Sequence, residues 1–352
     1  MQIDYLIVGQ GIAGSLLAEE LLKRNKKILV IDNNHKSSSS MVAAGLYNPV
    51  VFKRFAKSWM ADELIPFAIE TYTALEKKLN TRFHFSKNII KVFASEDEFN
   101  LWEKRRLEND FMAPAVRYNE MLEKAIHAPF GSGEVNSSGN VNVSLFLTIF
   151  NKYLKQENLL LNEKLNHEDI KFEDDCIYWK NIKAEKIIFC EGHKAIDNSF
   201  FNWLPFKLTK GELLRAKIDE LQSEKVINKG VFILPVEKNI YDVGATYNWN
   251  EFSEDPTPEG KSELIEKLEK LLKVPYEILN HNAGIRPTVS DRRPFIGAHP
   301  KYKRLLIFNG MGTKGVLIAP YFAAHFADFL TGKISEIDKE ADIVRISKKL
   351  KF

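Results

Sequence analysis

The N-terminal part of the chain combines two apolar runs with a segment of helical periodicity. The first run is Tyr5–Val8 and the second is Ile28–Ile31. Between them, apolar residues recur every three or four positions from Ile12 to Leu22. Short apolar runs are typical of buried strands, and the wider spacing is typical of an amphipathic helix. This part of the chain is therefore predicted to form a strand, a helix and a second strand.

Three glycines, Gly9, Gly11 and Gly14, stand in G-x-G-x-x-G spacing between the first predicted strand and the helix. In a dinucleotide-binding βαβ unit the first glycine permits the tight turn and the second lets the backbone approach a pyrophosphate. The third lets the helix pack closely on the strand. Asp32 ends the second strand at about the 20-residue distance typical of the carboxylate that binds ribose hydroxyls. The segment predicts nucleotide binding; the alternative is an ordinary βαβ turn.

The rest of the pattern predicts mixed helices and strands. The serine run Ser37–Ser40 offers hydroxyl and N–H donors to a phosphate, or is a plain linker. Residues 207–250 are rich in strand signals, and residues 131–140 are expected to be a loop that crosses between domains. The basic C-terminus, 347–352, is expected to be a solvated tail. Helices are predicted over residues 61–79, 141–153, 260–272 and 316–330, and strands over 89–93, 159–161, 186–190 and 304–308.

Composition places the chain among large globular proteins. With 352 residues, of which 45% are hydrophobic, it can bury a substantial core in one large or two interleaved domains. The net charge of +3 is small and the lysines are scattered, so charge does not indicate nucleic-acid binding. Only Cys176 and Cys190 occur, which argues against a disulfide scaffold and fits a reducing cytosol.

The sequence carries no signal for targeting, membrane insertion or metal binding. The chain begins on a strand without the apolar core of a signal peptide, and Gly315–Leu330 is too short and too polar to span a bilayer. H-E-x-x-H, C-x-x-C and EF-hand patterns do not occur. We therefore expect a cytoplasmic protein with no metal site and no membrane partner.

An ordered set of motifs resembles the flavin-dependent amine and D-amino-acid oxidase family, which includes glycine oxidase and sarcosine oxidase. The resemblance covers nearly the whole chain and implies FAD as the cofactor. After the glycine fingerprint, the motifs are Ala43–Gly45, Cys190–Gly192, a Lys210–Glu212 turn, Gly244–Thr246, Gly284–Pro287 with Asp291, Pro294–Gly297, and Asn309–Gly315.

The resemblance also implies a mixed α/β fold. It would contain a Rossmann-like, discontinuous FAD-binding domain with an inserted antiparallel-sheet substrate domain. The FAD-binding domain is expected over residues 1–80, 141–205 and 286–352. The substrate domain is expected over residues 81–140 and 206–285.

Three residues are the candidates for chemistry. In the family, the arginine that matches Arg286 binds a substrate carboxylate, and a planar guanidinium suits that role; the alternative is a salt bridge, for example to Asp291. Tyr247 follows a strand end where the family lines its substrate pocket, although a core tyrosine is the alternative. Lys314 lies in a glycine loop before a predicted helix, where it adds positive charge at the flavin N1/C2=O edge; the alternative is an exposed loop lysine.

FAD is expected to bind non-covalently, because no cysteine lies between Gly284 and Gly315, where sarcosine oxidases attach their flavin. The pattern and the resemblance together predict the following cofactor-binding residues: Gly9, Gly11, Ile12, Ala13, Gly14, Asp32, Asn33, Ser39, Ser40, Ala43, Ala44, Gly45, Leu46, Leu165, Glu191, Gly192, Gly310, Met311, Gly312, Thr313, Lys314 and Gly315.

The implied activity is oxidation of the C–N bond of an amino acid or N-substituted amino acid. Hydride would pass to flavin N5, with dioxygen or another electron acceptor reoxidising the flavin. The basic and aromatic segment Ala43–Trp59 instead resembles the flavin domain of a bifunctional tRNA-modifying enzyme. Lys53, Arg54 and Lys57 either favour oxidation of a carboxymethylaminomethyl-uridine group of tRNA or form a solvated helix start. A non-catalytic flavin-binding protein is the alternative of another class.

Overall fold

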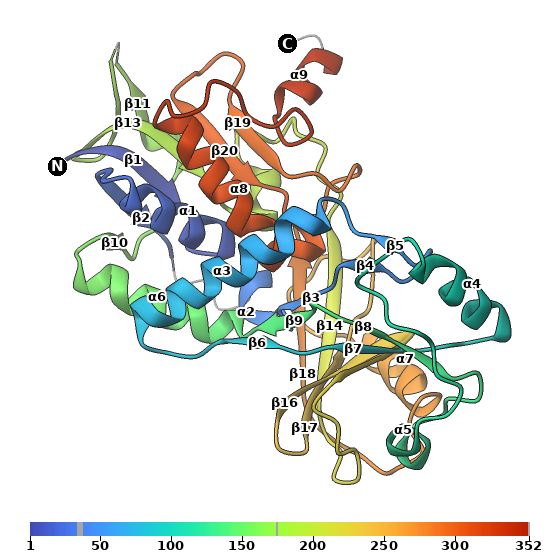
Figure 1. Cartoon of the computed structure of the whole chain (residues 1–352). Helices are drawn as coiled ribbons and strands as arrows, with labels where there is room; N and C mark the ends of the chain where they lie inside the picture. The colour runs from blue at the N-terminus through green and yellow to red at the C-terminus, as the bar shows by residue number, and fades with distance from the viewer. Residues whose placement is uncertain (34–37, 174, 351–352) are drawn as a thin grey trace.

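The computed structural model describes residues 1–33, 38–173 and 175–350 (Figure 1). Ser37, the first member of the predicted serine run, lies outside the described residues, whereas Ser38, Ser39 and Ser40 lie within them.

An eight-stranded sheet carries the N-terminal strands. Its order is β10-β2-β1-β13-β12-β11, and β20 pairs with both β13 and β19. Strands β2, β1, β13 and β20 are mutually parallel, so their carboxyl ends meet at one edge of the sheet. The strands are β1 (Gln2–Val8), β2 (Ile28–Ile31), β10 (Leu160–Leu161), β11 (Ile170–Phe172), β12 (Ile177–Trp179), β13 (Ile182–Phe189), β19 (Phe295–Ala298) and β20 (Leu305–Asn309).

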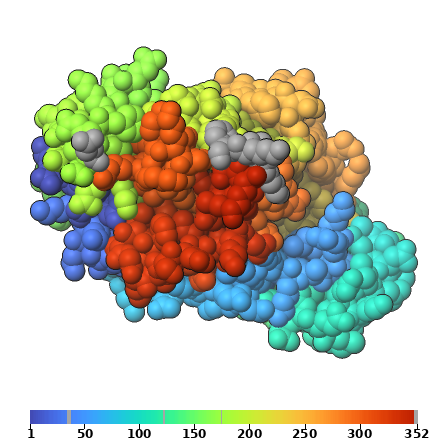
Figure 2. All heavy atoms as spheres, turned by 90° about the horizontal axis from the view of Figure 1, so that it is seen from above, coloured from blue at the N-terminus to red at the C-terminus, as the bar shows by residue number. Residues whose placement is uncertain are grey.

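Both faces of this sheet are buried. Four helices pack on one face: α1 (Ile12–Lys23), α3 (Ala61–Leu79), α6 (Val143–Gln156) and α8 (Gly315–Leu330). Within β1, Tyr5 and Ile7 pack against these helices, whereas Leu6 and Val8 join the core on the opposite face, as strand alternation requires. Because α8 packs against α1 and α3, elements from the N-terminal and C-terminal parts of the chain lie side by side, which Figure 2 shows as adjoining blue and red surfaces.

A seven-stranded sheet forms the lower part of the molecule in Figure 1. Its order is β18-β14-β17-β16-β15-β7-β8, and every neighbouring pair is antiparallel except β15 with β7. Helix α7 (Pro258–Glu269) contributes Leu264 and Leu268 to the core on one face. The strands are β7 (Ile89–Val92), β8 (Ser132–Val135), β14 (Thr209–Lys217), β15 (Val226–Lys229), β16 (Val231–Glu237), β17 (Ile240–Gly244) and β18 (Glu277–Arg286).

Smaller elements complete the fold. Strands β3 (Leu46–Tyr47), β9 (Gly139–Val141) and β6 (His84–Ser86) form a three-stranded sheet, and β4 (Val50–Val51) pairs with β5 (Ala56–Lys57). The remaining helices are α2 (Ser39–Val42), α4 (Glu96–Arg106), α5 (Glu120–Ala125), α9 (Val344–Leu350), and the 3-10 turns η1 (His167–Asp169), η2 (Gly192–Asp197) and η3 (Gly312–Lys314).

The described residues contain neither a membrane-spanning helix nor a metal-binding cluster. None of the helices in these ranges is long and apolar enough to cross a membrane. Over the same ranges, no group of three or more His, Cys, Asp or Glu side chains is arranged to hold a metal ion.

Four local predictions are wrong. Residues 131–140 contain strands β8 and β9 rather than one loop, and Lys210–Glu212 lies inside β14 rather than in a turn. Lys53 and Arg54 lie in the turn between β4 and β5, not at a helix start. Residues 347–350 of the basic C-terminus continue helix α9 rather than forming an irregular tail, and Lys351 and Phe352 lie outside the described residues. In β8, β9 and β14, pairing with strands distant in sequence overrides the weak local strand signal of a glycine-containing segment. At Lys53 and Arg54, the pairing of β4 with β5 across a short turn decides the structure.

Candidate active site

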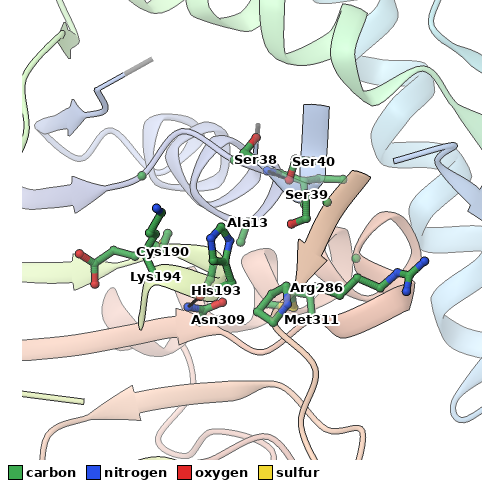
Figure 3. Close-up of a pocket in the computed structure, with 18 of the residues that line it drawn as sticks. Ala13, Ser38, Ser39, Ser40, Cys190, His193, Lys194, Arg286, Asn309 and Met311 are labelled. Carbon is green, nitrogen blue, oxygen red and sulfur yellow. Dashed lines mark hydrogen bonds between the residues drawn. The ribbon is translucent and has the colours of Figure 1, made fainter. Parts of the chain in front are cut away.

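A cavity of about 950 Å³ lies at the carboxyl edge of the parallel strands and extends to the seven-stranded sheet. The glycine turn after β1, the ends of β2 and β13, helix α2 and the loop after β20 line its first part. Residues of β14, β16 and β18 line its far end. In Figure 3, Ser39 and Ser40 lie on one side of the cavity, and Asn309 and Met311 lie on the other.

The glycine turn before α1 has the backbone that a pyrophosphate site requires. Gly9 has φ +104°, and a Cβ there would lie 2.5 Å from the Cys190 carbonyl oxygen. A Cβ on Gly14 would lie 1.9 Å from the Gly9 carbonyl oxygen, so helix and strand approach closely only because this residue is glycine.

Asp32 and Ser40 both contact this turn. Asp32 Oδ2 accepts a hydrogen bond from the Gln10 backbone N–H at 2.8 Å, which holds the turn against the end of β2. Ser40 Oγ accepts one from the Ile12 N–H at 3.2 Å, at the N-terminus of α1. The first N–H groups of a helix have no intrahelical partner and attract anions. The serine hydroxyl thus occupies a position suited to a phosphate oxygen.

A second glycine loop follows β20 and leads into α8. Gly310 and Gly312 have φ +77° and +57°, a region that favours glycine. Asn309 fixes this loop: its Nδ2 donates to the Gly192 carbonyl at 2.9 Å, and its Oδ1 accepts from the Gly310 N–H at 2.8 Å. Asn309 therefore joins the loops that follow β13 and β20 into one wall of the cavity.

Glu191 lies in a hydrogen-bonded cluster beside this wall. Its Oε1 lies 3.1 Å from Nε2 of His167, and its Oε2 accepts a hydrogen bond from Asn198 Nδ2 at 2.6 Å. His167 and Glu191 both line the cavity, and Leu165, on the same segment as His167, lines it as well. The cluster connects η1 to the end of β13.

Arg286, the last residue of β18, lies at the far end of the cavity. Its guanidinium packs on Gly211 so closely that a Cβ at position 211 would be 1.8 Å from Nη2. Nη1 donates to two backbone carbonyls, at 3.2 Å to Thr246 and at 3.4 Å to Lys210, and the guanidinium carbon lies 4.7 Å from the centre of the Tyr247 ring. Burial lowers the pKa of Arg286.

Tyr247 is 57% exposed, which is not the environment of a core tyrosine. It lines the cavity and lies against the guanidinium of Arg286. Within the described residues, Arg286 has no hydrogen bond or ion pair with a carboxylate, and Asp291 pairs with Arg345 instead. The cavity thus contains a guanidinium that keeps capacity for an anionic ligand.

Most of the predicted site residues meet in this one cavity. Three of them, Gly14, Gly310 and Lys314, do not line it. Gly14 and Gly310 belong to the two glycine loops but do not face the cavity, and the Lys314 ammonium donates a hydrogen bond to Ser58 Oγ at 2.7 Å. The predicted residues that do line it are Gly9, Gly11, Ile12, Ala13, Asp32, Asn33, Ser39, Ser40, Ala43, Ala44, Gly45, Leu46, Leu165, Glu191, Gly192, Tyr247, Arg286, Met311, Gly312, Thr313 and Gly315.

Several lining residues were missed by the sequence analysis. His193 and Lys194 follow the predicted Glu191–Gly192 pair on η2, and both contact Glu254 from the loop after β17. Gly211 was noted only as part of a motif, although it provides the surface on which Arg286 lies. His193 directly follows Gly192, which the sequence analysis predicted to bind the cofactor, and this adjacency was the signal available in the sequence.

The residues present fit a flavin dinucleotide. The cavity volume lies at the upper end of the roughly 300–1,000 Å³ range of ligand pockets. Two glycine loops with positive-φ residues open into it, and a Cβ at Gly11 would project toward Ser40 Oγ, 3.3 Å away, within the cavity lining. Gly9–Ala13 with Ser40 and Asp32 would hold the pyrophosphate and ribose, and the loop of Met311–Gly315 would hold the flavin edge.

Comparison with known proteins identifies relatives of this chain. The family model described as FAD dependent oxidoreductase (DAO) matches residues 4–329. Glycine oxidase from Bacillus subtilis is 24% identical over 94% of this chain and 93% of its own length. The crystal structure of glycine oxidase from Geobacillus kaustophilus superposes with a TM-score of 0.81 at 20% identity and covers 96% of each chain.

A second kind of relative matches only in part. The tRNA 5-methylaminomethyl-2-thiouridine biosynthesis bifunctional protein MnmC from Idiomarina loihiensis is 25% identical over 46% of this chain and 27% of its own length. The family match, in contrast, spans both sheets and both glycine loops. This chain is a member of the DAO family of FAD-dependent oxidoreductases, with the mixed α/β fold of that family and FAD as its cofactor.

Proposed function

We propose that this enzyme oxidises the C–N bond of an amino acid or an N-substituted amino acid. The observation that supports it best is the environment of Arg286. This guanidinium lies in the cavity on Gly211 and Tyr247, and the described residues provide it with backbone carbonyls but no carboxylate. A guanidinium forms paired hydrogen bonds with a carboxylate, and the family relative from Bacillus subtilis is a glycine oxidase.

The protein's own part in the reaction is binding and orientation. FAD, when bound, would supply the acceptor for a hydride from the substrate α-carbon, and dioxygen or another acceptor would take up the electrons. Arg286 fixes the carboxylate, and the two carbonyl acceptors of its Nη1 fix the guanidinium. The ring of Tyr247 lies against the guanidinium and helps to hold it in place.

The test is anaerobic bleaching of the flavin by paired substrates. Each amino acid or N-alkyl glycine is compared with the same amine lacking the carboxylate, in the natural protein and in Arg286→Lys. Lysine keeps the charge but loses the planar fork. A hydrogen bond to a charged group contributes about 1.5–3 kcal/mol. We therefore expect Arg286→Lys to bind the carboxylate substrates about ten-fold to more than a hundred-fold more weakly, and to bind the amines that lack the carboxylate as the natural protein does.

The matched control is Arg215→Lys on the neighbouring strand β14. Arg215 is an exposed residue of β14 that pairs with Asp242 away from the cavity. Its replacement should leave both substrate series unchanged. Equal losses for carboxylates and for amines in Arg286→Lys, or no loss for either, would show that Arg286 is structural and would refute the proposed substrate class.

A second candidate is oxidation of a carboxymethylaminomethyl-uridine group of tRNA. Two observations favour it: the partial match to MnmC, and the exposure of Lys53 and Arg54 in the turn between β4 and β5. Lys57 is less available, because it pairs with Asp62 at 3.0 Å. If tRNA is the substrate, tRNA carrying that group should bleach the flavin. The double variant Lys53→Ala, Arg54→Ala should then slow bleaching by this tRNA and leave bleaching by free amino acids unchanged.

We also propose that the protein acts in the cytoplasm. Both cysteines, Cys176 and Cys190, are free thiols in the structure, as expected in a reducing compartment.

A further inference from the structure

The floor of the far end of the cavity consists of glycines on neighbouring strands. Gly211 of β14 lies directly opposite Gly284 of β18 in the antiparallel register. A Cβ on Gly211 would collide with the Arg286 guanidinium, and a Cβ on Gly284 would lie 3.3 Å from Ser39 and 3.4 Å from Val42 of α2. This face of the sheet is therefore turned toward α2 and the FAD-binding loops.

Two apolar side chains continue that face. Leu213 is two residues beyond Gly211 on β14, so its side chain is on the same side of the sheet. Leu213 and Phe232 both lie opposite Gly244 in the register. A Cβ on Gly244 would lie 2.0 Å from Leu213 Cδ2 and 3.0 Å from Phe232 Cζ. The leucine and the phenylalanine therefore converge over this glycine and line the cavity together.

The opposite side of this region is apolar as well. Val42, Ala44 and Leu46 line the cavity from α2 and β3. Among the described lining residues, Arg286 is the only charged one that the seven-stranded sheet contributes; the others come from residues 32, 163–169 and 191–197. The far end thus has a single cation beside an apolar wall.

The wall is offset from Arg286 along the strand. Residues two apart on one strand are separated by roughly 7 Å. The guanidinium lies on Gly211, so the Leu213 side chain stands further along the same face of the sheet. Glycine carries nothing beyond its amine and its carboxylate and therefore has no group to place against that side chain.

We propose that the Leu213–Phe232 wall selects amino acids carrying an apolar group of several carbons, on the α-carbon or on the amine nitrogen. The inference rests on the proposed function and narrows its substrate class. Burial of apolar surface against the two side chains favours such substrates, and a charged group of the same length is disfavoured because no charged side chain of the sheet faces it.

The test is a substrate series with the natural holoenzyme under anaerobic conditions. Glycine, alanine, norvaline, norleucine and phenylalanine vary the side chain, and N-methyl, N-propyl and N-benzyl glycine vary the nitrogen substituent. Glutamate is the charged control for norleucine. We expect kcat/KM to rise along at least one series, by about tenfold or more per group that reaches the wall, and glutamate to be poorer than norleucine. The series that rises identifies which substituent contacts the wall.

The variants are Leu213→Ala and Phe232→Leu, with Leu279→Ala as the control. Leu279 is an exposed residue of β18, 46% accessible, and does not line the cavity. Each cavity variant should lower kcat/KM for the large apolar substrates by a larger factor than for glycine and N-methylglycine, so that most of the advantage of the large substrates is lost. Phe232→Leu keeps an apolar side chain and provides a test if Leu213→Ala fails to fold.

The outcomes separate this inference from the proposed function. If glycine or glutamate matches or exceeds the large apolar substrates, the apolar wall does not select substrate, although amino-acid oxidation stands. If none of the amino acids bleaches the flavin, the proposed function itself fails. If the variants lower kcat/KM equally for all substrates, the Leu213–Phe232 wall is structural and does not select the substrate.

Discussion

The Lys314 ammonium donates a hydrogen bond to Ser58 Oγ over 2.7 Å, and Ser58 in turn donates to the Asn48 backbone carbonyl at 3.1 Å. These bonds hold the lysine side chain outside the cavity lining, although its neighbours Thr313 and Gly315 line the cavity. Burial, followed by the charges of Arg292 and Arg293, lowers the pKa of Lys314 to about 8. The ammonium is therefore charged below about pH 8 and loses its charge as the pH rises through that value.

Lys314→Met is expected to lower the flavin reduction potential at neutral pH. A cation behind the loop of Gly310–Gly315 stabilises the negative charge that reduction places on the flavin edge. Because that cation is lost near pH 8, the difference between the natural protein and the variant should shrink at higher pH. The measurement is the midpoint potential of both proteins well below and well above pH 8.

Ser58→Ala is the control for the lysine's position. It removes the acceptor but keeps the charge, so its potential should stay closer to that of the natural protein than the potential of Lys314→Met does. Identical potentials in all three proteins at every pH would mean that Lys314 has no electrostatic effect on the flavin.

The orientation of Lys314 also illustrates what the sequence cannot predict. Its partner Ser58 is 256 residues away in the chain. Ser58 lies just after the β4–β5 pair, for which the sequence analysis offered a helix start as one of two alternatives and predicted no strands. The same limit applies to Leu213 and Phe232, which meet only because β14, β17 and β16 pair in a particular register. Contacts of this kind depend on tertiary pairing.

Elements with a strong local signal were predicted well. The helix predicted over residues 61–79 has those bounds in the structure, because its apolar positions recur with helical period over five turns. The glycine loops were predictable because their backbone conformations require glycine. Helix α4 was missed although Ser95 caps it by accepting from the Glu98 N–H, and Glu98 returns a bond to the Ala94 N–H. The signal of Ser95 followed by Glu98 was present in the sequence.

FAD is expected to leave the protein on acid precipitation and to appear in the supernatant. Both cysteines are buried, and burial raises the pKa of the Cys190 thiol well above its usual range, which suppresses the reactive thiolate. Cys190→Ala should release the flavin in the same way. Yellow colour that stays with the pellet of the natural protein would contradict non-covalent binding.

The ion pair between the buried Lys210 and the partly exposed Glu251 predicts an acid dependence of stability. The Glu251 carboxylate accepts hydrogen bonds from Lys210 and from Ser253, and these lower its pKa from 4.5 to about 2. A carboxyl group with a lowered pKa in the folded state stabilises the protein fully above pH 4.5 and loses this effect as the pH falls toward 2.

The measurement is urea unfolding of the natural protein and of Glu251→Gln. At neutral pH the natural protein should be the more stable of the two, and the difference should shrink as the pH falls below 4.5. Glu259→Gln, which changes an exposed acid near the same loop, should show no such convergence. A difference that stays constant with pH would contradict a role for the charge of Glu251.

The glycines of the first loop predict two distinct kinds of defect. A Cβ on Gly14 would lie 1.9 Å from the Gly9 carbonyl oxygen, so Gly14→Ala forces helix α1 away from β1. Overpacking of this kind costs about 1–3 kcal/mol or more, and Gly14→Ala should lower the thermal midpoint of the FAD-free protein.

Gly11 predicts a different defect. The nearest atom to a Cβ at Gly11 is the Ser40 hydroxyl oxygen at 3.3 Å, and this hydroxyl can rotate away. The φ angle of Gly11 is −73°, which any residue can adopt. Gly11→Ala should therefore fold as well as the natural protein but bind FAD at least tenfold more weakly, because its methyl group occupies space beside the pyrophosphate. Thermal unfolding without FAD and titration with FAD separate the two effects. If Gly11→Ala bound FAD normally, the turn after β1 would not be the site of close backbone approach to the cofactor.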